Sequence, residues 1–382
     1  MRALGTDSGS SFSPFDVQCM KRAFALAGRG MGKTAPNPMV GAVLAKNGRI
    51  IGEGWHRRYG GAHAEDEAVT AALAEGNSPK GADLYCTLEP CCFTAPDKNR
   101  PPCTGLIIKS KIKRVFVANL DPHPKVRGKG IALLKQAGIP VQAGLCSETG
   151  EELNRAFFSF HRLGRPFVHL KMAQSLDGRI AAQDGGARWI SDETARRMVH
   201  HLRGFYDAAL IGRGTAVADD PELTVRLARG RNPRRIILDS SLAIPETARI
   251  LRLPDPEKTT IMHTDRADSR KAEILHSCGA ELISINADSL SLNQVLAALG
   301  ERGIQSVLVE GGAGVFSSFL REGLWDRLSV FIAPVILGGG VNAVSGLGIT
   351  TMDQALRFTG GSFRRVGSQI LFEVQNNVYG ID

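Results

Sequence analysis

The sequence has no apolar run long enough to cross a membrane. Its longest apolar stretch, residues 329–341, contains Pro334 and three glycines, whereas a transmembrane helix needs about 20 consecutive apolar residues. Residues 1–16 are rich in serine and glycine and lack the apolar segment of a signal peptide. We therefore expect a protein that has no membrane partner.

Cysteine is scarce and odd in number, with seven among 382 residues. An odd count cannot pair completely within one chain, and no two cysteines have the C-x-x-C spacing. Because disulfides are rare in reducing compartments, we expect a cytoplasmic protein. The length suffices for two domains, each with its own core.

Acidic residues are scarce only in the first part of the chain. Residues 1–150 carry 20 Lys and Arg against 12 Asp and Glu, whereas residues 151–382 carry 27 against 26. The surplus is densest at Lys109, Lys111, Lys113 and Arg114. We interpret this run as a solvated edge between a helix and a strand. The alternative is attraction of a phosphorylated or polyanionic substrate.

Residues that can bind zinc follow one another in a characteristic order. His63 and Glu65 are followed by Cys91 and Cys103, and each cysteine comes directly after a proline. If His63 and both cysteines stand at helix starts, one zinc ion has three protein ligands and an open fourth position, which is typical of a catalytic site. The zinc deaminases of pyrimidine- and purine-type rings share this order.

Glu65 is the candidate catalytic residue. Zinc lowers the pKa of a bound water to about 7, so hydroxide is available at neutral pH. Deamination needs attack of this hydroxide on a ring carbon and a proton for the departing amine. A carboxyl group near both atoms can take the first proton and return it as a general acid. The sequence therefore predicts zinc-hydroxide deamination with Glu65 as proton shuttle.

Two other interpretations of the cysteines remain open. They could form a structural zinc knot or be buried free thiols. A structural knot needs a fourth ligand, for which Cys92 is the nearby candidate, but adjacent cysteines rarely bind one ion without strain.

The pattern of apolar segments predicts two α/β units, each with a layered sheet that helices cover on both faces. In the first unit, strands at 40–45 and 49–52 flank the hairpin turn Asn47-Gly48. A polar boundary follows near residues 147–165. In the second unit, Ser191 is the expected N-cap of a helix at 192–203. Further elements are predicted as helices at 64–75 and 129–137 and as strands at 84–88, 114–119, 140–144, 167–173, 207–212, 234–239, 259–263, 281–285, 305–309 and 328–333.

The glycine-rich segment 309–316 follows a predicted strand and opens a helix, so its N–H groups could hold a pyrophosphate. It matches only two glycines of the G-x-G-x-x-G pattern, with Ser317 in the third place, so a structural turn is an equal alternative. For two further segments, 175–179 and 218–226, the residue types by themselves predict only capped turns. Arg203 and Arg226 could bind a phosphate, although most arginines form surface ion pairs.

The combination of motifs resembles the bifunctional deaminase–reductase family of riboflavin biosynthesis, whose activities are diaminohydroxyphosphoribosylaminopyrimidine deaminase and 5-amino-6-(5-phosphoribosylamino)uracil reductase. The resemblance extends from about Asp16 to Val374. The motifs that carry it are, in chain order, Pro36-Asn37-Pro38-Met39-Val40-Gly41, the zinc residues with Thr87-Leu88-Glu89-Pro90-Cys91, Ser175-Leu176-Asp177-Gly178-Arg179, Trp189-Ile190-Ser191, residues 218–226, and Val309-Glu310-Gly311-Gly312.

This resemblance implies a cytidine-deaminase-like domain at 14–146 and a dihydrofolate-reductase-like α/β domain at 147–382. The first would deaminate a diaminopyrimidinone ribosyl phosphate with one zinc per chain, and the second would reduce the ribosyl chain to ribityl with NADPH. Implied substrate contacts are Ala187, Arg203, Leu223, Arg226 and Glu310. Implied cofactor contacts are Ala173, Trp189, Thr215, Asp219, Ser240, Gly312, Ala313, Gly314, Val315, Phe316, Ser317 and Ser318. We expect a homo-oligomer that binds a small phosphorylated pyrimidine and no nucleic acid.

Two departures from the family pattern concern the substrate. Residues 92–100 between the zinc cysteines are longer than usual and contain no histidine, so the resemblance implies no specific deaminase substrate contacts there. Ala187 stands where serine is common. Rival functions are an RNA-binding base deaminase, which the basic first part favours, and a zinc-stabilised scaffold, against which the open fourth zinc position argues.

Overall fold

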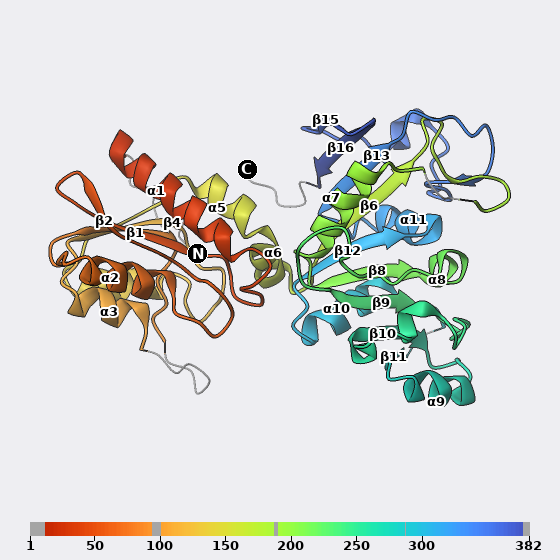
Figure 1. Ribbon diagram of the computed structural model, residues 1–382, viewed down its shortest axis with the longest axis horizontal. Helices are drawn as coiled ribbons and strands as arrows, with labels where there is room; N and C mark the ends of the chain where they lie inside the picture. The colour runs from red at the N-terminus through yellow and green to blue at the C-terminus, as the bar shows by residue number, and fades with distance from the viewer. Residues whose placement is uncertain (1–11, 94–100, 187–189, 287, 377–382) are drawn as a thin grey trace. The chain divides into compact units, whose positions relative to one another are not determined.

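The computed structural model describes residues 12–93, 101–186, 190–286 and 288–376. The chain divides into two compact units, Met1–Arg162 and Leu163–Asp382 (Figure 1). Among the described residues, no helix is long and apolar enough to span a bilayer.

The first unit is a five-stranded sheet in the order β2-β1-β3-β4-β5, in which β3, β4 and β5 are parallel and β1 is antiparallel to both neighbours. The Asn47-Gly48 hairpin is confirmed, and both residues have positive φ, 52° and 74°. The strands are β1 (Gly41–Lys46), β2 (Arg49–Trp55), β3 (Asp83–Leu88), β4 (Arg114–Asn119) and β5 (Val141–Ala143). The helices are α1 (Pro14–Ala27), η1 (Gly28–Gly30), α2 (Ala64–Ala74), α3 (Cys103–Lys109), α4 (Lys129–Gln136), α5 (Ser147–Leu153) and α6 (Arg155–Leu163).

Helices cover both faces of this sheet, as predicted. Alternate residues of β1 point to opposite faces, because side chains of a strand alternate. Leu44 packs with apolar residues of α2, α3 and α4, and Val43 packs with those of α1.

The two units divide between Arg162 and Leu163, within the segment 147–165 near which the sequence places the boundary, but the sequence predicted no helix there. This segment forms α5 and α6, and α6 buries Phe157 and Phe158 against Leu88. Helix α1 was not predicted, although the capping box of Ser13 and Asp16 marks its start.

The second unit is a nine-stranded sheet in the order β11-β10-β9-β8-β12-β6-β13-β16-β15, with the strands from β11 to β13 parallel and the last two antiparallel. Helices α10 and α11 pack on one face, and α7, α8 and α9 pack on the other. The strands are β6 (Phe167–Gln174), β7 (Arg179–Ala181), β8 (Ala208–Gly212), β9 (Arg234–Leu238), β10 (Thr259–Thr264), β11 (Glu281–Ile285), β12 (Ser306–Gly311), β13 (Arg327–Ile332), β14 (Val341–Asn342), β15 (Ser362–Val366) and β16 (Gln369–Gln375). The helices are α7 (Glu193–Arg203), α8 (Arg213–Asp219), η2 (Arg249–Leu251), η3 (Pro256–Lys258), α9 (Ser269–Ser277), α10 (Leu292–Glu301), α11 (Ala313–Arg321) and η4 (Met352–Gln354).

The N-cap of α7 is Asp192 rather than the predicted Ser191. Its carboxylate accepts hydrogen bonds from the backbone N–H of Ala195 and of Ser368. It therefore joins the helix start to the turn between β15 and β16, strands that the sequence did not predict.

Strand β12 lies between β6 and β8, although it comes later in the chain. Chain order is broken at this point of the parallel sheet, and such a switch point opens a crevice at the carboxyl ends of the strands. The ends of β6, β8 and β12 are where the structure has its second candidate site.

Candidate active sites

Three side chains that can bind a metal converge at the carboxyl end of β3. His63 is the N-cap of α2, Cys91 follows β3, and Cys103 is the first residue of α3. His63 Nδ1 lies 3.1 Å from Cys103 Sγ and 3.5 Å from Cys91 Sγ. Among the described residues, they are the one group of three or more His, Cys, Asp or Glu side chains close enough to hold a metal.

This spacing fits a zinc ion. Bonds of about 2.0–2.3 Å in a tetrahedral site hold the ligand atoms roughly 3.5 Å apart. Cys92 does not belong to the group, because its thiol donates to the Lys125 carbonyl at 3.8 Å. The expectation that both cysteines stand at helix starts was wrong for Cys91, which lies in an irregular segment after β3.

A hydrogen bond joins the side chains of Cys91 and Cys103. Their hydrogen bond is the main reason that the pKa of Cys91 is lowered to about 4 and that of Cys103 is raised. The backbone N–H of Cys103 also donates to Cys91 Sγ at 3.4 Å. Zinc binds the thiolate form of cysteine, which the lowered pKa of Cys91 favours.

Glu65 lies in the first turn of α2, beside this group. It is only 3% exposed, and its carboxyl group hydrogen-bonds the Cys103 side chain. Burial raises the pKa of Glu65 above its ordinary value, which favours a carboxyl that holds and returns a proton. The helix start is fixed against β2, because a Cβ on Gly54 would lie 2.3 Å from the Ala64 carbonyl oxygen.

Two buried side chains hold the segments around the zinc ligands. Glu89, which is 3% exposed, accepts hydrogen bonds from the backbone N–H groups of Asp121, Gly128 and Ile131. His56 Nδ1 donates to the Ala62 carbonyl at 2.8 Å, so its Nε2 accepts from the Asn37 amide. Sequence analysis assigned neither role, because both depend on contacts across the fold.

Separate substitution of Cys91 and Cys92 tests which of these neighbouring cysteines binds zinc. We expect Cys91→Ser to lose most of the one zinc per chain, because the hydroxyl of serine is a poor ligand for zinc. The matched variant Cys92→Ser should retain it. Metal analysis of the purified variants would measure this, and full zinc in Cys91→Ser with loss in Cys92→Ser would reverse the assignment.

The second unit has two adjoining cavities at the ends of β6, β8 and β12, of about 330 Å³ and about 560 Å³. Ile180, Thr215, Asp219 and Gly312 line both. Of the expected substrate contacts, Arg203, Leu223, Arg226 and Glu310 line the smaller cavity. Ala187 and Trp189 lie outside the described residues.

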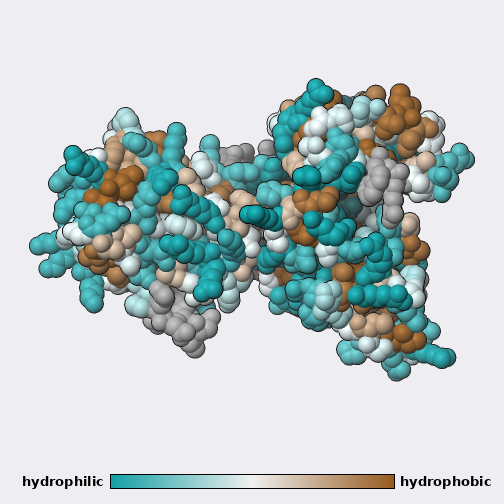
Figure 2. Space-filling view, in the orientation of Figure 1, coloured by the Kyte–Doolittle hydropathy of each residue, from teal (hydrophilic) through white to brown (hydrophobic). Residues whose placement is uncertain are grey.

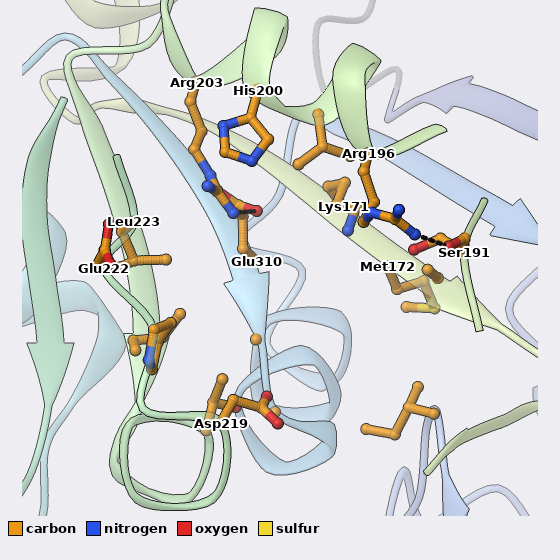
Figure 3. A pocket seen from close by; sticks show the side chains of 18 of the residues that line it. Lys171, Met172, Ser191, Arg196, His200, Arg203, Asp219, Glu222, Leu223 and Glu310 are labelled. Carbon is orange, nitrogen blue, oxygen red and sulfur yellow. Dashed lines mark hydrogen bonds and ion pairs between the residues drawn. The ribbon is translucent and has the colours of Figure 1, made fainter. Parts of the chain in front are cut away.

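The smaller cavity contains a nearly buried ion pair. Arg203 and Glu310 form two hydrogen bonds, of 2.5 and 2.9 Å, and their side chains are 13% and 4% exposed (Figure 3). Burial opposes ionisation of Glu310, but Arg203 outweighs it and the pKa of the carboxyl is lowered. The two paired side chains therefore form one rigid, charged part of the cavity lining.

Lys171 and His200 also line this cavity, and sequence analysis did not assign them to it (Figure 3). Burial, reinforced by Arg203, lowers the pKa of His200 to about 4. Its Nδ1 accepts from the Arg226 backbone N–H at 3.0 Å, so Nε2 carries the proton. Burial also lowers the pKa of Lys171. The one sequence signal for Lys171 was a charged residue inside an apolar strand.

The larger cavity surrounds the start of α11. Gly312 has a φ of 87° and is the N-cap of the helix, which confirms that the glycine-rich segment joins a strand to a helix. A Cβ on Gly311 would lie 2.8 Å from Thr215, so the turn packs tightly on α8. Expected cofactor contacts that line this cavity are Thr215, Asp219, Ser240, Gly312, Ala313, Gly314 and Val315.

The remaining expected cofactor contacts are placed differently. Ala173 and Phe316 line the smaller cavity. Ser317 is buried and accepts from the Ser345 N–H, and Ser318 accepts from Arg321. Asp219 is the last residue of α8 and is close to both cavities.

The basic run at residues 109–114 is exposed except for Ile112 and Ser110, and Arg114 pairs with Asp83. The exposure of these side chains agrees with our interpretation of the run as a solvated edge between a helix and a strand.

Comparison with known families assigns each unit. The cytidine and deoxycytidylate deaminase zinc-binding region matches residues 14–119, and the RibD C-terminal domain matches residues 166–372. A riboflavin biosynthesis protein RibD of Bacillus amyloliquefaciens is 44% identical over 89% of this chain and 91% of its own length. The RibD of Escherichia coli is 37% identical over 93% and 98%.

Solved structures agree with this. The RibD of Acinetobacter baumannii superposes with a TM-score of 0.85 at 36% identity and covers 94% of this chain and 98% of its own. A Thermotoga maritima diaminohydroxyphosphoribosylaminopyrimidine deaminase/5-amino-6-(5-phosphoribosylamino)uracil reductase gives 0.82 at 37% identity, with 94% and 98% covered. A cytidine-deaminase-like unit thus precedes a dihydrofolate-reductase-like unit, and the chain belongs to the RibD family of bifunctional riboflavin biosynthesis proteins.

Proposed function

We propose that this chain deaminates a diaminopyrimidinone ribosyl phosphate in its first unit and reduces the ribosyl chain of the product to ribityl with NADPH in its second. The observation that carries the proposal is the group of His63, Cys91 and Cys103 with the buried Glu65 beside it. The relatives matched over nearly the whole chain support the second reaction.

In the deaminase, His63, Cys91 and Cys103 hold the zinc ion, and Glu65 moves protons. When bound, zinc activates a water molecule for attack on the ring carbon. Glu65 accepts a proton from the attacking side and delivers it to the departing amine, for which its raised pKa suits it. The Asn37 amide donates to His56 Nε2 at 3.2 Å, which fixes the Asn37 side chain in the first unit.

In the reductase, the smaller cavity binds the substrate and the larger one binds NADPH. The backbone N–H groups at the start of α11 face the cofactor, because a helix N-terminus attracts phosphate. Arg203, Leu223, Arg226 and Glu310 bind the substrate, with Ala187 as a further contact. The two cavities share Thr215 and Asp219, so hydride donor and acceptor carbon meet there, where alignment is the main task of the protein.

We propose a deaminase domain that begins at residue 14 and a reductase domain that extends to residue 382. The sequence set the boundary at 146/147. The matched regions 14–119 and 166–372 support a boundary between them, and packing of residues 147–162 with the first unit favours a later one. Limited proteolysis should cut after α6 rather than before α5, whereas a cut near residue 146 that leaves two folded pieces would support the earlier boundary.

We also propose a homo-oligomer that forms through the second unit. Strand β15 is a sheet edge, and Phe363 and Ile370 are 70% and 50% exposed on it and its neighbour β16. Apolar side chains also gather on the segment that follows β13, where Met352 is 74% exposed (Figure 2). Exposed apolar surface of this kind marks interfaces. Sedimentation should give a multiple of 41.0 kDa, and Phe363→Glu should shift it toward the monomer.

We propose a cytoplasmic location. All seven cysteines are free thiols in the structure, as a reducing compartment requires. Cell fractionation that recovers the protein outside the cytosol would contradict this.

The direct test of the function is a coupled assay on the diaminopyrimidinone ribosyl phosphate. The zinc-loaded chain should release ammonia and then oxidise one NADPH per ammonia. If the chain released ammonia but oxidised no NADPH, even when it was given the pre-deaminated substrate, only the deaminase part of the proposal would stand.

A further inference from the structure

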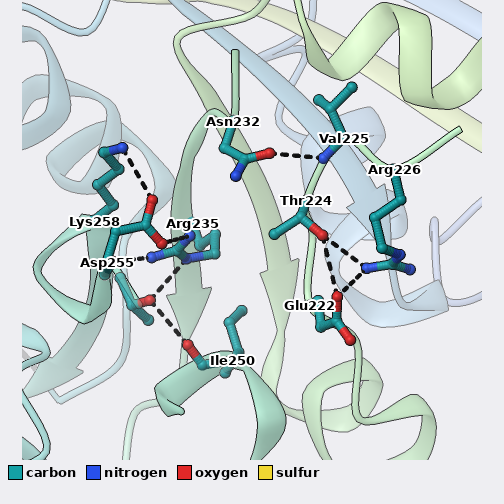
Figure 4. Close-up of polar contacts among 10 residues, drawn as sticks. Glu222, Thr224, Val225, Arg226, Asn232, Arg235, Ile250, Asp255 and Lys258 are labelled. Atoms are coloured by element: carbon teal, nitrogen blue, oxygen red, sulfur yellow. Dashed lines mark hydrogen bonds and ion pairs between the residues drawn. The ribbon is translucent and has the colours of Figure 1, made fainter. Parts of the chain in front are cut away.

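The motif at residues 218–226 contains three polar residues that the proposed function does not use: Asp220, Glu222 and Thr224. Glu222 contacts two arginines at once. One carboxylate oxygen pairs with Nη1 of Arg226, and the other pairs with Nη2 of Arg249. Arg226 Nη1 also donates to Thr224 Oγ1 at 2.7 Å (Figure 4). The motif therefore gathers two guanidinium groups around one carboxylate.

Arg249 comes from a distant segment, and the motif fixes its backbone. The Arg249 N–H donates to Asp220 Oδ1 at 2.8 Å. The next residues, Ile250 and Leu251, are 1% and 4% exposed and anchor the segment in the core. Asp220 can point this way because it ends α8 in a left-handed conformation, with a φ of 42°.

A buried network supports the same segment from behind. Arg235 on β9 is fully buried, and its guanidinium binds the Thr259 hydroxyl and the Asp255 carboxylate at 2.9 Å each. Thr259 Oγ1 donates in turn to the Ile250 carbonyl at 3.2 Å (Figure 4). The backbone that carries Arg249 is therefore rigid. A side chain that binds a ligand in a fixed position requires such a support.

Both arginines line the smaller cavity and can be reached from solvent, since their side chains are 50% and 54% exposed. The Glu222 carboxylate contacts both guanidiniums, whereas the Asp220 carboxylate binds the Arg249 backbone N–H. A guanidinium has five N–H donors, and one carboxylate occupies only part of the ten on the pair. The remaining donors suit a phosphate, which arginines bind in pairs of parallel hydrogen bonds.

We propose that Arg249 is a second phosphate-binding residue of the reductase, beside Arg226. Glu222 and Asp220 are positioning residues: Glu222 holds the two guanidiniums together, and Asp220 holds the Arg249 backbone. The proposal rests on the proposed reductase function and assigns the phosphate of its substrate to this rim of the cavity. Glu222 offsets the repulsion of the two arginines in the free enzyme, while Arg203 remains paired with Glu310 deeper in the cavity.

The test compares two substrates, the pre-deaminated ribosylamino pyrimidine phosphate and the same compound without phosphate. For each enzyme, kcat/KM is measured by NADPH oxidation. Arg249→Gln should lower the preference for the phosphorylated substrate about 10- to 100-fold, as expected when charge-assisted hydrogen bonds are lost. The change should fall mainly on KM. Arg249→Lys, which keeps the charge but not the fork of donors, should lie between.

Arg252→Gln is the matched control, because Arg252 is an exposed arginine of the same segment that does not line the cavity. Quenching of NADPH fluorescence on binding shows that each variant is folded. A preference in Arg249→Gln equal to that in Arg252→Gln would overturn the role of Arg249, as would equal losses on both substrates. Failure of the unsubstituted enzyme to oxidise NADPH with the phosphorylated substrate would instead overturn the proposed function.

Discussion

Glu65→Gln is expected to lower the rate of ammonia release at least about 10²-fold while the zinc content stays at one per chain. Glutamine keeps the shape of the side chain but cannot accept and return a proton, and general acid–base catalysis contributes about 10²- to 10⁴-fold. The substitution leaves the proposed zinc ligands, His63, Cys91 and Cys103, unchanged. Ammonia release would be measured under saturating substrate, with metal analysis on the same sample.

The matched control is Glu67→Gln on the same helix, since Glu67 pairs with Arg57 and its side chain is 26% exposed. It should release ammonia at close to the normal rate. If Glu65→Gln released ammonia as fast as this control, Glu65 would not be the proton shuttle.

Glu310→Gln is expected to lower kcat/KM of the reductase at least about 10²-fold and leave ammonia release unchanged. The substitution leaves the Arg203 guanidinium nearly buried without its carboxylate, and loss of one partner of a buried ion pair costs about 3–5 kcal/mol. Burial lowers the pKa of Lys171, and the negative charge of Glu310 raises it. The substitution removes this charge. NADPH oxidation with pre-deaminated substrate measures the effect, and thermal unfolding shows how much of it is stability.

Glu246→Gln is the control for this second change, because Glu246 pairs with Lys271 at the surface and its side chain is 46% exposed. Such exposed pairs contribute little, so NADPH oxidation should stay near normal. If Glu310→Gln also lost ammonia release, the two sites would not be independent.

The strands and the zinc site could be predicted because their signals are local. Strand β4 is a short buried apolar run bounded by polar residues, and the predicted ranges of β4 and β11 agree with the structure. His63, Cys91 and Cys103 carry their chemistry in their residue types, and the sheet brings them together.

Other elements carry weak or misleading local signals. Helix α5 is short and polar, and α6 is short, with Phe157 and Phe158 packed through tertiary contacts. Strand β15 is exposed along most of its length, so it lacks the apolar alternation that marks a strand. At the start of α7, Ser191 and Asp192 are both good N-caps, and the hydrogen bonds to Ser368 favour the aspartate.

The reductase site illustrates the same limit. Arg203 and Glu310 were each expected to contact substrate, but their mutual pairing depends on α7 lying across the end of β12. The proximity of Arg249 to Arg226 depends on Asp220, which the sequence shows only as part of a capped turn. Contacts between distant segments are set by packing, and no local pattern encodes them.

We expect the two sites of this chain to be chemically independent, one dependent on zinc and one on NADPH. This independence is tested most directly by treating the purified chain with a zinc chelator and assaying both steps separately. We predict that ammonia release from the diaminopyrimidinone ribosyl phosphate is lost and returns on addition of zinc, while NADPH oxidation with pre-deaminated substrate continues at its original rate. Loss of both activities on chelation, with the second unit still folded, would contradict the account.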